Sequence, residues 1–212
     1  TVFNMLTGVY PPTSGSIHFC EKPALNLKPF ELSQRGMTRT FQNIRLFKQL
    51  SVLDNIRIAF HQHTRYSMWE ALFVSRRMQR EEKEIVERSI NLLKIFGMEK
   101  RAPEMAGSLS CGAQRRLEIL RALATKPKLV MLDEPAAGMN HSETHTLMET
   151  IHHIRDQFHV AILLIEHDMK LVMGICERIL VLDHGVTICE GDAGKVQGDP
   201  KVIEAYLGCD TP

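Results

Sequence analysis

The sequence lacks an excess of charge of either sign. It contains 26 lysine and arginine residues and 25 aspartate and glutamate residues, so its formal net charge is +1. Nucleic acids and anionic membranes attract strongly basic proteins, and this balance gives no electrostatic reason to expect either as the main partner. Local patches remain possible. Arg76, Arg77 and Arg80 form one basic cluster that could meet lipid headgroups or a partner, although such runs are usually only solvated.

Long hydrophobic runs are also absent. The longest covers residues 160–165, far short of the roughly 20 residues that span a bilayer. The five cysteines are widely spaced and form no C-x-x-C pair: Cys20, Cys111, Cys176, Cys189 and Cys209. This pattern argues against a disulfide framework or a zinc knuckle, and a reducing compartment fits it better.

Short apolar runs and amphipathic helix patterns alternate from residue 126 onward. The runs at 129–132, 160–165 and 179–182 each end in polar residues, and a helix with Leu147, Ile151 and Ile154 on one face separates the first two. Buried strands that alternate with helices predict a parallel sheet covered on both faces. Open α/β sheets bind their ligands at the carboxyl ends of the strands, where these polar residues lie.

The chain divides into three predicted regions. Residues 1–51 begin with the end of a helix, which Gly8 can cap, and continue as short β structure over residues 13–40, where Pro29 breaks the run. Residues 52–125 are mostly helical, and residues 126–212 form the alternating part. Asn140 and Glu143 have the spacing of a helix capping box.

Four polar features occur in an order that suits phosphate chemistry. They are Gln42, the segment Leu109-Ser110-Cys111-Gly112-Ala113-Gln114-Arg115 at the start of a helix, the pair Asp133-Glu134, and His167. Asp133 can hold Mg²⁺, while Glu134 can orient or deprotonate a water. Gln42 can ligate the metal or position that water, and His167 can donate to a phosphate. The Ser-x-Gly helix start offers free N–H groups to an anion.

These residues carry a family resemblance that covers essentially the whole chain. LSCGAQRR resembles the signature motif of ABC ATPases, LVMLDEP the Walker B strand and AAGMN the D-loop. Gln42 and His167 resemble the Q-loop and H-loop residues. The resemblance implies an α/β fold with a P-loop NTPase core, a mostly parallel sheet, a partial antiparallel β subdomain and an α-helical subdomain. RTFQNIRLF, LDEPAAGMN and the terminal AYLG resemble one branch, the LivG-like ATPases of branched-chain amino acid importers.

The resemblance also implies a site for the cofactors ATP and Mg²⁺. Glu134, His167 and Gln42 are the expected catalytic residues, and Asp133 and Gln42 the expected metal ligands. The expected nucleotide contacts are Ser110, Gly112, Gln114, Asp133 and Thr1. Cys111 and Ala113 depart from the commonest signature, which has Gly and Gln at these positions. Cys111 at a helix start could be a reactive thiol, although a tolerated small residue is the simpler interpretation.

Partners follow from the same resemblance. ABC ATPases work as head-to-tail pairs, so we expect Ser110 and Gly112 to complete the site of a second ATPase subunit, identical or similar. We also expect transmembrane permease subunits and a peripheral location at the cytoplasmic face of the membrane, with no role for nucleic acid. The family's phosphate loop should immediately precede TVFNMLTG. We therefore expect a chain cut inside a helix, which in this form binds ATP poorly and does not hydrolyse it.

Several alternatives stay open. The chain could be a soluble ABC-type ATPase in nucleic-acid or ribosome work, the ATPase of a urea or amide importer or of a lipopolysaccharide exporter, or a non-catalytic interaction module. Phe41, Leu46 and Phe47 could form a groove for a membrane-subunit helix or belong to the core. His141, His145 and His152 fall on one helix face, and the first two have zinc-ligand spacing. The face is polar, which favours a solvated surface.

Overall fold

A computed structural model describes residues 1–64 and 66–207 of the chain. It divides into two compact units, Thr1–Ile165 and Glu166–Pro212, which are treated separately below. The three-region division given above stays a prediction. Cys209 and the last residue of the AYLG string, Gly208, lie outside the described residues.

A parallel sheet lies at the centre of the first unit. Its strands are β3 (Met37–Arg39), β4 (Leu129–Asp133) and β5 (Ala161–Ile165), in that order, with β4 in the middle. The apolar runs at 129–132 and 160–165 are thus confirmed as strands. Because β4 is flanked on both sides, it reads as a continuous apolar run and ends where its first carboxylate, Asp133, begins to reach solvent.

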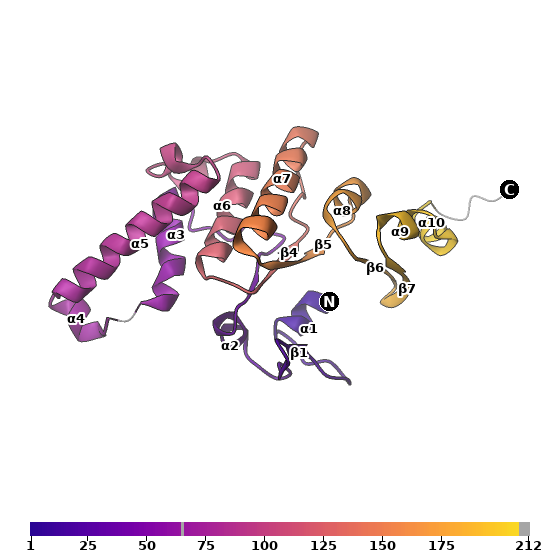
Figure 1. Cartoon of the computed structure of the whole chain (residues 1–212), viewed down its shortest axis with the longest axis horizontal. Coiled ribbons are helices and arrows are strands. Elements are labelled where there is room, and N and C mark those ends of the chain that lie inside the picture. The colour runs from indigo at the N-terminus through magenta and orange to yellow at the C-terminus, as the bar shows by residue number, and fades with distance from the viewer. Residues whose placement is uncertain (65, 208–212) are drawn as a thin grey trace. The chain divides into compact units, whose positions relative to one another are not determined.

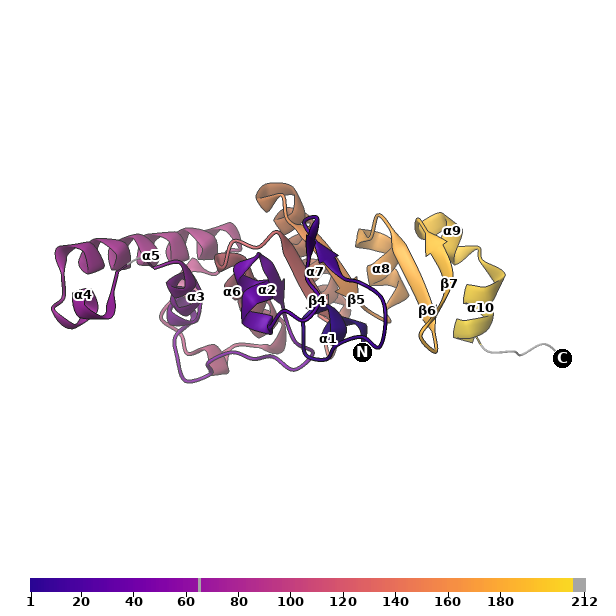
Figure 2. The same cartoon turned by 90° about the horizontal axis from the view of Figure 1, so that it is seen from below.

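Helices cover both faces of this sheet (Figures 1 and 2). On one face, Phe3 of α1 (Val2–Leu6) and Leu32 of α2 (Pro29–Gln34) pack in a cluster with Met131. Side chains alternate along a strand, so the buried neighbours Val130 and Leu132 point to the opposite face. There α6 (Cys111–Ala124) and α7 (His141–Phe158) lie next to each other.

The segment between α1 and β3 differs in part from the predicted short β structure. Strands β1 (His18–Phe19) and β2 (Lys22–Pro23) form an antiparallel hairpin, but residues 29–34 form the helix α2. We interpreted Pro29 as a break, whereas it occupies the first turn of a helix. Proline is tolerated there because its missing N–H would have no partner. The Glu31 carboxylate accepts the Lys28 N–H at 2.8 Å and completes this start.

Residues 52–125 are mostly helical, as their pattern predicts. Besides α6 they form α3 (Val52–Phe60), η1 (His61–His63), α4 (Met68–Leu72), α5 (Arg76–Ile95), η2 (Glu99–Arg101) and η3 (Ala106–Ser108). Helices α3, α5 and α6 lie together in both views (Figures 1 and 2). Ile85, Ser89 and Leu92 are buried along one face of α5, and Gly97 follows the helix end with a φ of 63°.

The second unit is built around an antiparallel hairpin of β6 (Ile179–Asp183) and β7 (Val186–Gly191). Helices α8 (Met169–Ile175), α9 (Ala193–Gln197) and α10 (Pro200–Leu207) accompany it, and Val181, Cys189 and Val196 lie in its core cluster. The run at 179–182 is therefore a strand, as predicted. Within the described residues it pairs antiparallel with β7 instead of extending a parallel sheet.

Candidate functional site

Asp133 and Glu134 stand at the carboxyl end of β4. Asp133 is the last residue of the strand and is paired in register with Ile165 of β5. Glu134 follows with a φ of 43°, and its N–H donates to the Ile165 carbonyl oxygen at 2.9 Å. A left-handed glutamate costs on the order of 1 kcal/mol and persists only where the surroundings enforce it, which is common at functional sites.

Gln42 meets Glu134 at this edge of the sheet. The Gln42 Nε2 donates to Glu134 Oε2 at 2.8 Å, across 92 residues of sequence. Two residues earlier, the Thr40 N–H still bonds to the Met131 carbonyl at 2.9 Å, so the loop leaves the sheet just before Gln42. The structure thus brings together two of the three residues predicted to be catalytic, while their roles stay predictions.

Arg39 is a member of this site that sequence reasoning missed. Its Nη2 pairs with Asp133 Oδ2 at 2.6 Å, and its Nη1 donates to Asn4 Oδ1 at 2.7 Å and to Thr7 Oγ1 at 3.2 Å. The Arg39 and Asp133 side chains are only 12% and 19% exposed. Arg39 is therefore the cation that compensates the Asp133 charge in this structure, and it ties β4 to α1.

The oxygen ligands at this edge suit Mg²⁺. Carboxylate and amide oxygens are the protein ligands that this ion takes, usually one or two together with phosphates and waters. Asp133 supplies a carboxylate. Gln42 uses its amide nitrogen on Glu134, which leaves its Oε1 for a cation. A metal would share Asp133 with the Arg39 guanidinium or displace it from Oδ2.

The predicted signature residues lie at the first turn of α6. Ser110 is the N-cap, and its Oγ accepts the Ala113 N–H across a long 3.4 Å. Gln114 turns its Nε2 back to the Leu109 carbonyl at 2.9 Å. Gly112 is buried against α7: a Cβ atom there would lie 2.9 Å from Glu143 Oε1. A side chain at Gly112 would therefore displace the Glu143 carboxylate from its present position.

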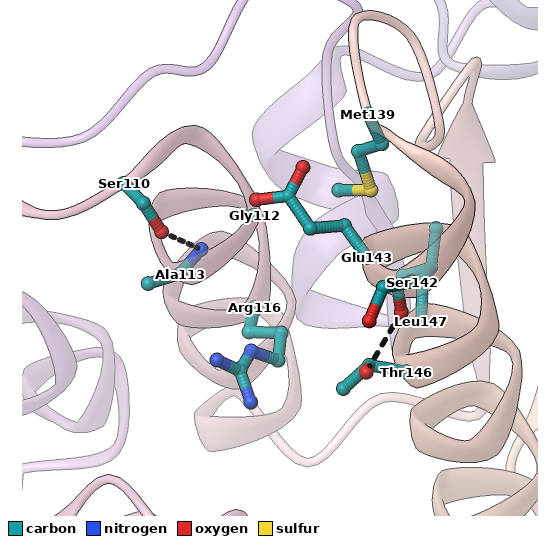
Figure 3. Close-up of a pocket in the computed structure, with 9 residues that line it drawn as sticks. All are labelled: Ser110, Gly112, Ala113, Arg116, Met139, Ser142, Glu143, Thr146 and Leu147. Atoms are coloured by element: carbon teal, nitrogen blue, oxygen red, sulfur yellow. Dashed lines mark hydrogen bonds between the residues drawn. The ribbon is translucent and has the colours of Figure 1, made fainter.

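A pocket of about 80 Å³ opens between the starts of α6 and α7 (Figure 3). Ser110 and Gly112 line it from one side, and the Glu143 side chain points from α7 toward the first turn of α6. Arg116 adds a cation to the lining. A helix start and an arginine favour an anion, but Glu143 is itself an anion and already fills the space beside Gly112.

The other two predicted site residues are Thr1 and His167. Thr1 is exposed at the start of α1, where its carbonyl accepts the Asn4 N–H at 3.0 Å. His167 follows β5 by two residues and belongs to the second unit, where its N–H donates to Glu166 Oε2 at 3.1 Å. Their roles at a phosphate stay predictions.

The aromatic residues near Gln42 separate into two groups. Phe41 is half-buried between guanidinium groups, with Arg45 3.9 Å and Arg39 5.3 Å from its ring centre. Phe47 is 50% exposed and lines a hollow of about 330 Å³ with Ile58 and Arg121. Burial lowers the pKa of Arg121, and the nearby Glu118 charge only partly offsets this.

The chain is similar to known transport ATPases along nearly all of its length. The high-affinity branched-chain amino acid transport ATP-binding protein LivG of Salmonella typhimurium is 42% identical over 208 residues, which are 98% of this chain and 82% of that protein. BraF of Pseudomonas aeruginosa, a protein of the same description, is 41% identical with the same coverage.

A solved structure agrees with these sequences. The crystal structure of a nucleotide-free ATP-binding cassette from an ABC transporter has a TM-score of 0.80 and 30% identity, and the match covers 98% of this chain and 82% of that one. Residues 1–137 match the ABC transporter family, and residues 186–208 match the family of branched-chain amino acid ATP-binding cassette transporters. The chain therefore belongs to the ABC transporter family, and its fold is that of the family's ATP-binding cassettes.

Proposed function

We propose that this chain is the ATP-binding and ATP-hydrolysing subunit of an importer for branched-chain amino acids. The family membership and the cassette fold support the ATPase. The substrate class rests on what LivG and BraF are described as transporting, together with the match of residues 186–208. Selectivity for an amino acid would reside in other subunits, so this chain supplies the energy for transport and does not select the substrate.

The contact between Gln42 and Glu134 carries the proposal for the chemistry. It fixes the orientation of the Glu134 carboxylate at the end of β4, directly beside Asp133. In that position Glu134 accepts the proton of the attacking water, a role that typically contributes 10²- to 10⁴-fold. Gln42 restrains the carboxylate through its amide nitrogen and offers its oxygen to the metal or the water.

Asp133 and Gln42 are the proposed ligands of the metal that accompanies ATP. Mg²⁺ held by these residues would supply positive charge to the phosphates. Arg39 holds Asp133 Oδ2 in a 2.6 Å ion pair at this end of β4. His167 is the proposed donor to the γ-phosphate, and Thr1 the proposed contact next to the phosphate loop.

The proposed transporter also contains a second ATPase subunit and a permease. Ser110, Gly112 and Gln114 would serve the nucleotide held by that subunit, and the hollow beside Phe47 would receive a segment of a permease. Among the residues that the structure describes, no helix is both long and apolar enough to cross a membrane. We place the chain at the cytoplasmic face of the membrane, attached through the permease.

The substitution Glu134→Gln tests this proposal in a chain that carries a phosphate loop before Thr1. It removes the proton acceptor but keeps the shape, so we expect nucleotide affinity to change less than threefold while kcat falls at least about a hundredfold. Steady-state hydrolysis and equilibrium binding of ATP measure the two quantities. Glu149→Gln, on the exposed face of α7, is the matched control and should keep kcat. Normal turnover by Glu134→Gln would show that Glu134 is not the base.

A further inference from the structure

One buried ion pair of the signature helix holds the first part of the loop of residues 41–50. Arg115 and Glu118 lie one turn apart on α6, 2.7 Å from each other, and their side chains are only 3% and 2% exposed. Arg115 Nη1 donates to the Phe41 carbonyl at 2.6 Å and its Nη2 to the Gln42 carbonyl at 2.7 Å. Glu118 Oε1 accepts the Arg45 N–H at 3.1 Å. The planar guanidinium thus grips two consecutive peptide groups as a fork.

Asn55 of α3 holds the far part of the same loop. Its Oδ1 accepts the Phe47 N–H and its Nδ2 donates to the Phe47 carbonyl, both at 3.0 Å. Asn55 is fully buried. Three buried polar side chains of the helical region therefore form hydrogen bonds with the backbone of a loop that has no regular structure of its own.

The attachment of the loop to the sheet is different in kind. The backbone bond from Thr40 to Met131 lies just before the loop, and beyond it Gln42 reaches Glu134 through an exposed side-chain contact. Backbone at 41–47 is thus fixed to α6 and α3, while the Gln42 amide extends to the carboxyl end of β4. If α6 moves relative to β4, the Gln42 carbonyl moves with α6 and the amide is drawn along.

Burial of such a pair is costly and needs an explanation. A buried ion pair is often no more stabilising than apolar residues of the same size, whereas a half-broken pair is strongly destabilising. Here all the other bonds of the pair go to the loop backbone, at Phe41, Gln42 and Arg45. A function in fixing that backbone accounts for charges that the packing of α6 alone does not require.

We propose that Arg115 and Glu118 are positioning residues that hold the Gln42 amide at the Glu134 carboxylate. Through Arg115 and Glu118, the distance between the Gln42 amide and Glu134 depends on the position of helix α6. The proposal rests on the proposed function, because its consequence for turnover requires Glu134 to act on ATP. Its structural part, the fixing of the loop backbone by α6, can be tested without any hydrolysis.

Hydrogen exchange tests the structural part. Arg115→Lys keeps the charge but loses the fork, and the paired variant Arg115→Met with Glu118→Met removes both charges without leaving one of them buried alone. We expect both to fold, and the amide of Arg45 to exchange at least about tenfold faster in the paired variant, with the amides of β4 unchanged. Arg101→Lys alters a half-exposed Arg–Glu pair of the same spacing and is the control. Unchanged protection of Arg45 in the folded paired variant would overturn the proposal.

A double-mutant cycle tests the link to turnover. In a chain with a phosphate loop, Arg115→Lys should lower kcat by on the order of ten- to a hundredfold and leave KM for ATP within twofold, because a small displacement of a catalytic contact has this effect. Gln42→Ala removes the side chain through which the pair acts. The variant with both changes should therefore be no slower than Gln42→Ala alone.

The outcomes separate this proposal from the proposed function. If the two losses in kcat multiply, Arg115 acts by a route other than Gln42 and the positioning role is wrong. If Glu134→Gln turns over normally while Arg115→Lys and Gln42→Ala remain coupled, the base assignment fails, and the positioning of Gln42 by Arg115 stands without Glu134 as its target. If Arg115→Lys keeps full kcat, the fork is not needed, and the inference is overturned even though the ATPase is real.

Discussion

The carboxyl end of β4 and the first turn of α6 are predicted to serve the same kind of ligand, yet they are built differently. At β4, each carboxylate has a partner from another element: Asp133 has Arg39 at 2.6 Å and Glu134 has Gln42 at 2.8 Å. At α6, Ser110 caps its own helix through a 3.4 Å bond, and Gly112 packs directly against Glu143.

This difference shows which half of the site is organised by the chain itself. Contacts among Arg39, Asp133, Gln42 and Glu134 fix the carboxylates before any ligand arrives, which is the arrangement that electrostatic catalysis favours. The first turn of α6 has N–H groups and a hydroxyl but also a carboxylate beside Gly112. A phosphate presented to that turn from a second subunit would have to displace Glu143 or bind on the other side of it.

The largest effect is expected from breaking the contact of Arg39 with Asp133. Arg39→Met leaves the mostly buried Asp133 without its cation and Asn4 without its donor, so we expect the free energy of unfolding to fall by about 2–4 kcal/mol. Urea unfolding measures this loss. The variant should also bind Mn²⁺ more tightly than wild type in the absence of nucleotide, since a competing cation has gone.

Two further variants control this prediction. Arg39→Lys retains one charge but not the contacts to both Asp133 and Asn4, and should lose about half as much. Adding Asp133→Asn to Arg39→Met removes the uncompensated charge and should restore most of the stability. If Arg39→Met is as stable as wild type, Arg39 does not compensate Asp133, and the claim that this edge is organised within the chain is wrong.

A smaller effect is expected from filling the space at Gly112. In Gly112→Ala the new Cβ would stand 2.9 Å from Glu143 Oε1, so the Glu143 side chain must move away from the start of α7, where it also accepts the Asn140 N–H. Loss of that cap should cost about 1 kcal/mol, read from thermal unfolding. In a Glu143→Ala background the same change should cost almost nothing.

The Gly112 pair of experiments also separates packing from ligand binding. If Gly112 is needed only to admit Glu143, then Gly112→Ala with Glu143→Ala should dimerise on ATP as well as Glu143→Ala alone. We expect instead that dimerisation stays impaired, because in the proposed function the backbone of the first turn approaches a phosphate closely. Light scattering with a hydrolysis-deficient Glu134→Gln background measures it.

The parts of the fold that sequence predicted are those specified locally. The strands at 129–132 and 160–165 follow from continuous apolar runs, and the start of α7 follows from Asn140 and Glu143, whose reciprocal bonds the structure contains. The partner of β6 was not predicted from its apolar run. Gly185, shortly after this run, was the available signal, because glycine favours tight turns. In the structure His184 and Gly185 have φ values of 47° and 84° and form the two-residue turn that joins the antiparallel strands.

The parts of the site that sequence could not reach are those made by distant elements. Gln42 and Glu134 were identified through the family order of motifs. Arg39 contacts Asp133 across 94 residues, and its role depends on β3 being the neighbour of β4. Arg115 and Glu118 carried a weak signal, since they share a face of α6 with the buried Ala122. Charges in an otherwise apolar helix face indicate a buried partner but do not say which one.

The smallest effect separates the two uses of Ser110. Ser51 and Ser110 are both N-caps, but Ser51 accepts the Asp54 N–H at 3.0 Å whereas the Ser110 bond is 3.4 Å long. We therefore expect Ser51→Ala to lower the free energy of unfolding by about 1 kcal/mol and Ser110→Ala by about half of that or less.

ATP-dependent dimerisation should show the opposite order. Ser110→Ala removes a hydroxyl that a phosphate from the second subunit could use, while Ser51 caps α3 at a helix start with no predicted contact to nucleotide. When the two variants are compared, Ser110→Ala should reduce ATP-dependent dimerisation more than Ser51→Ala does, although Ser110 is the weaker helix cap. If Ser110→Ala instead destabilises the fold as much as Ser51→Ala and leaves dimerisation intact, then Ser110 is a structural cap like any other. The first turn of α6 would then hold its ligand through backbone N–H groups alone.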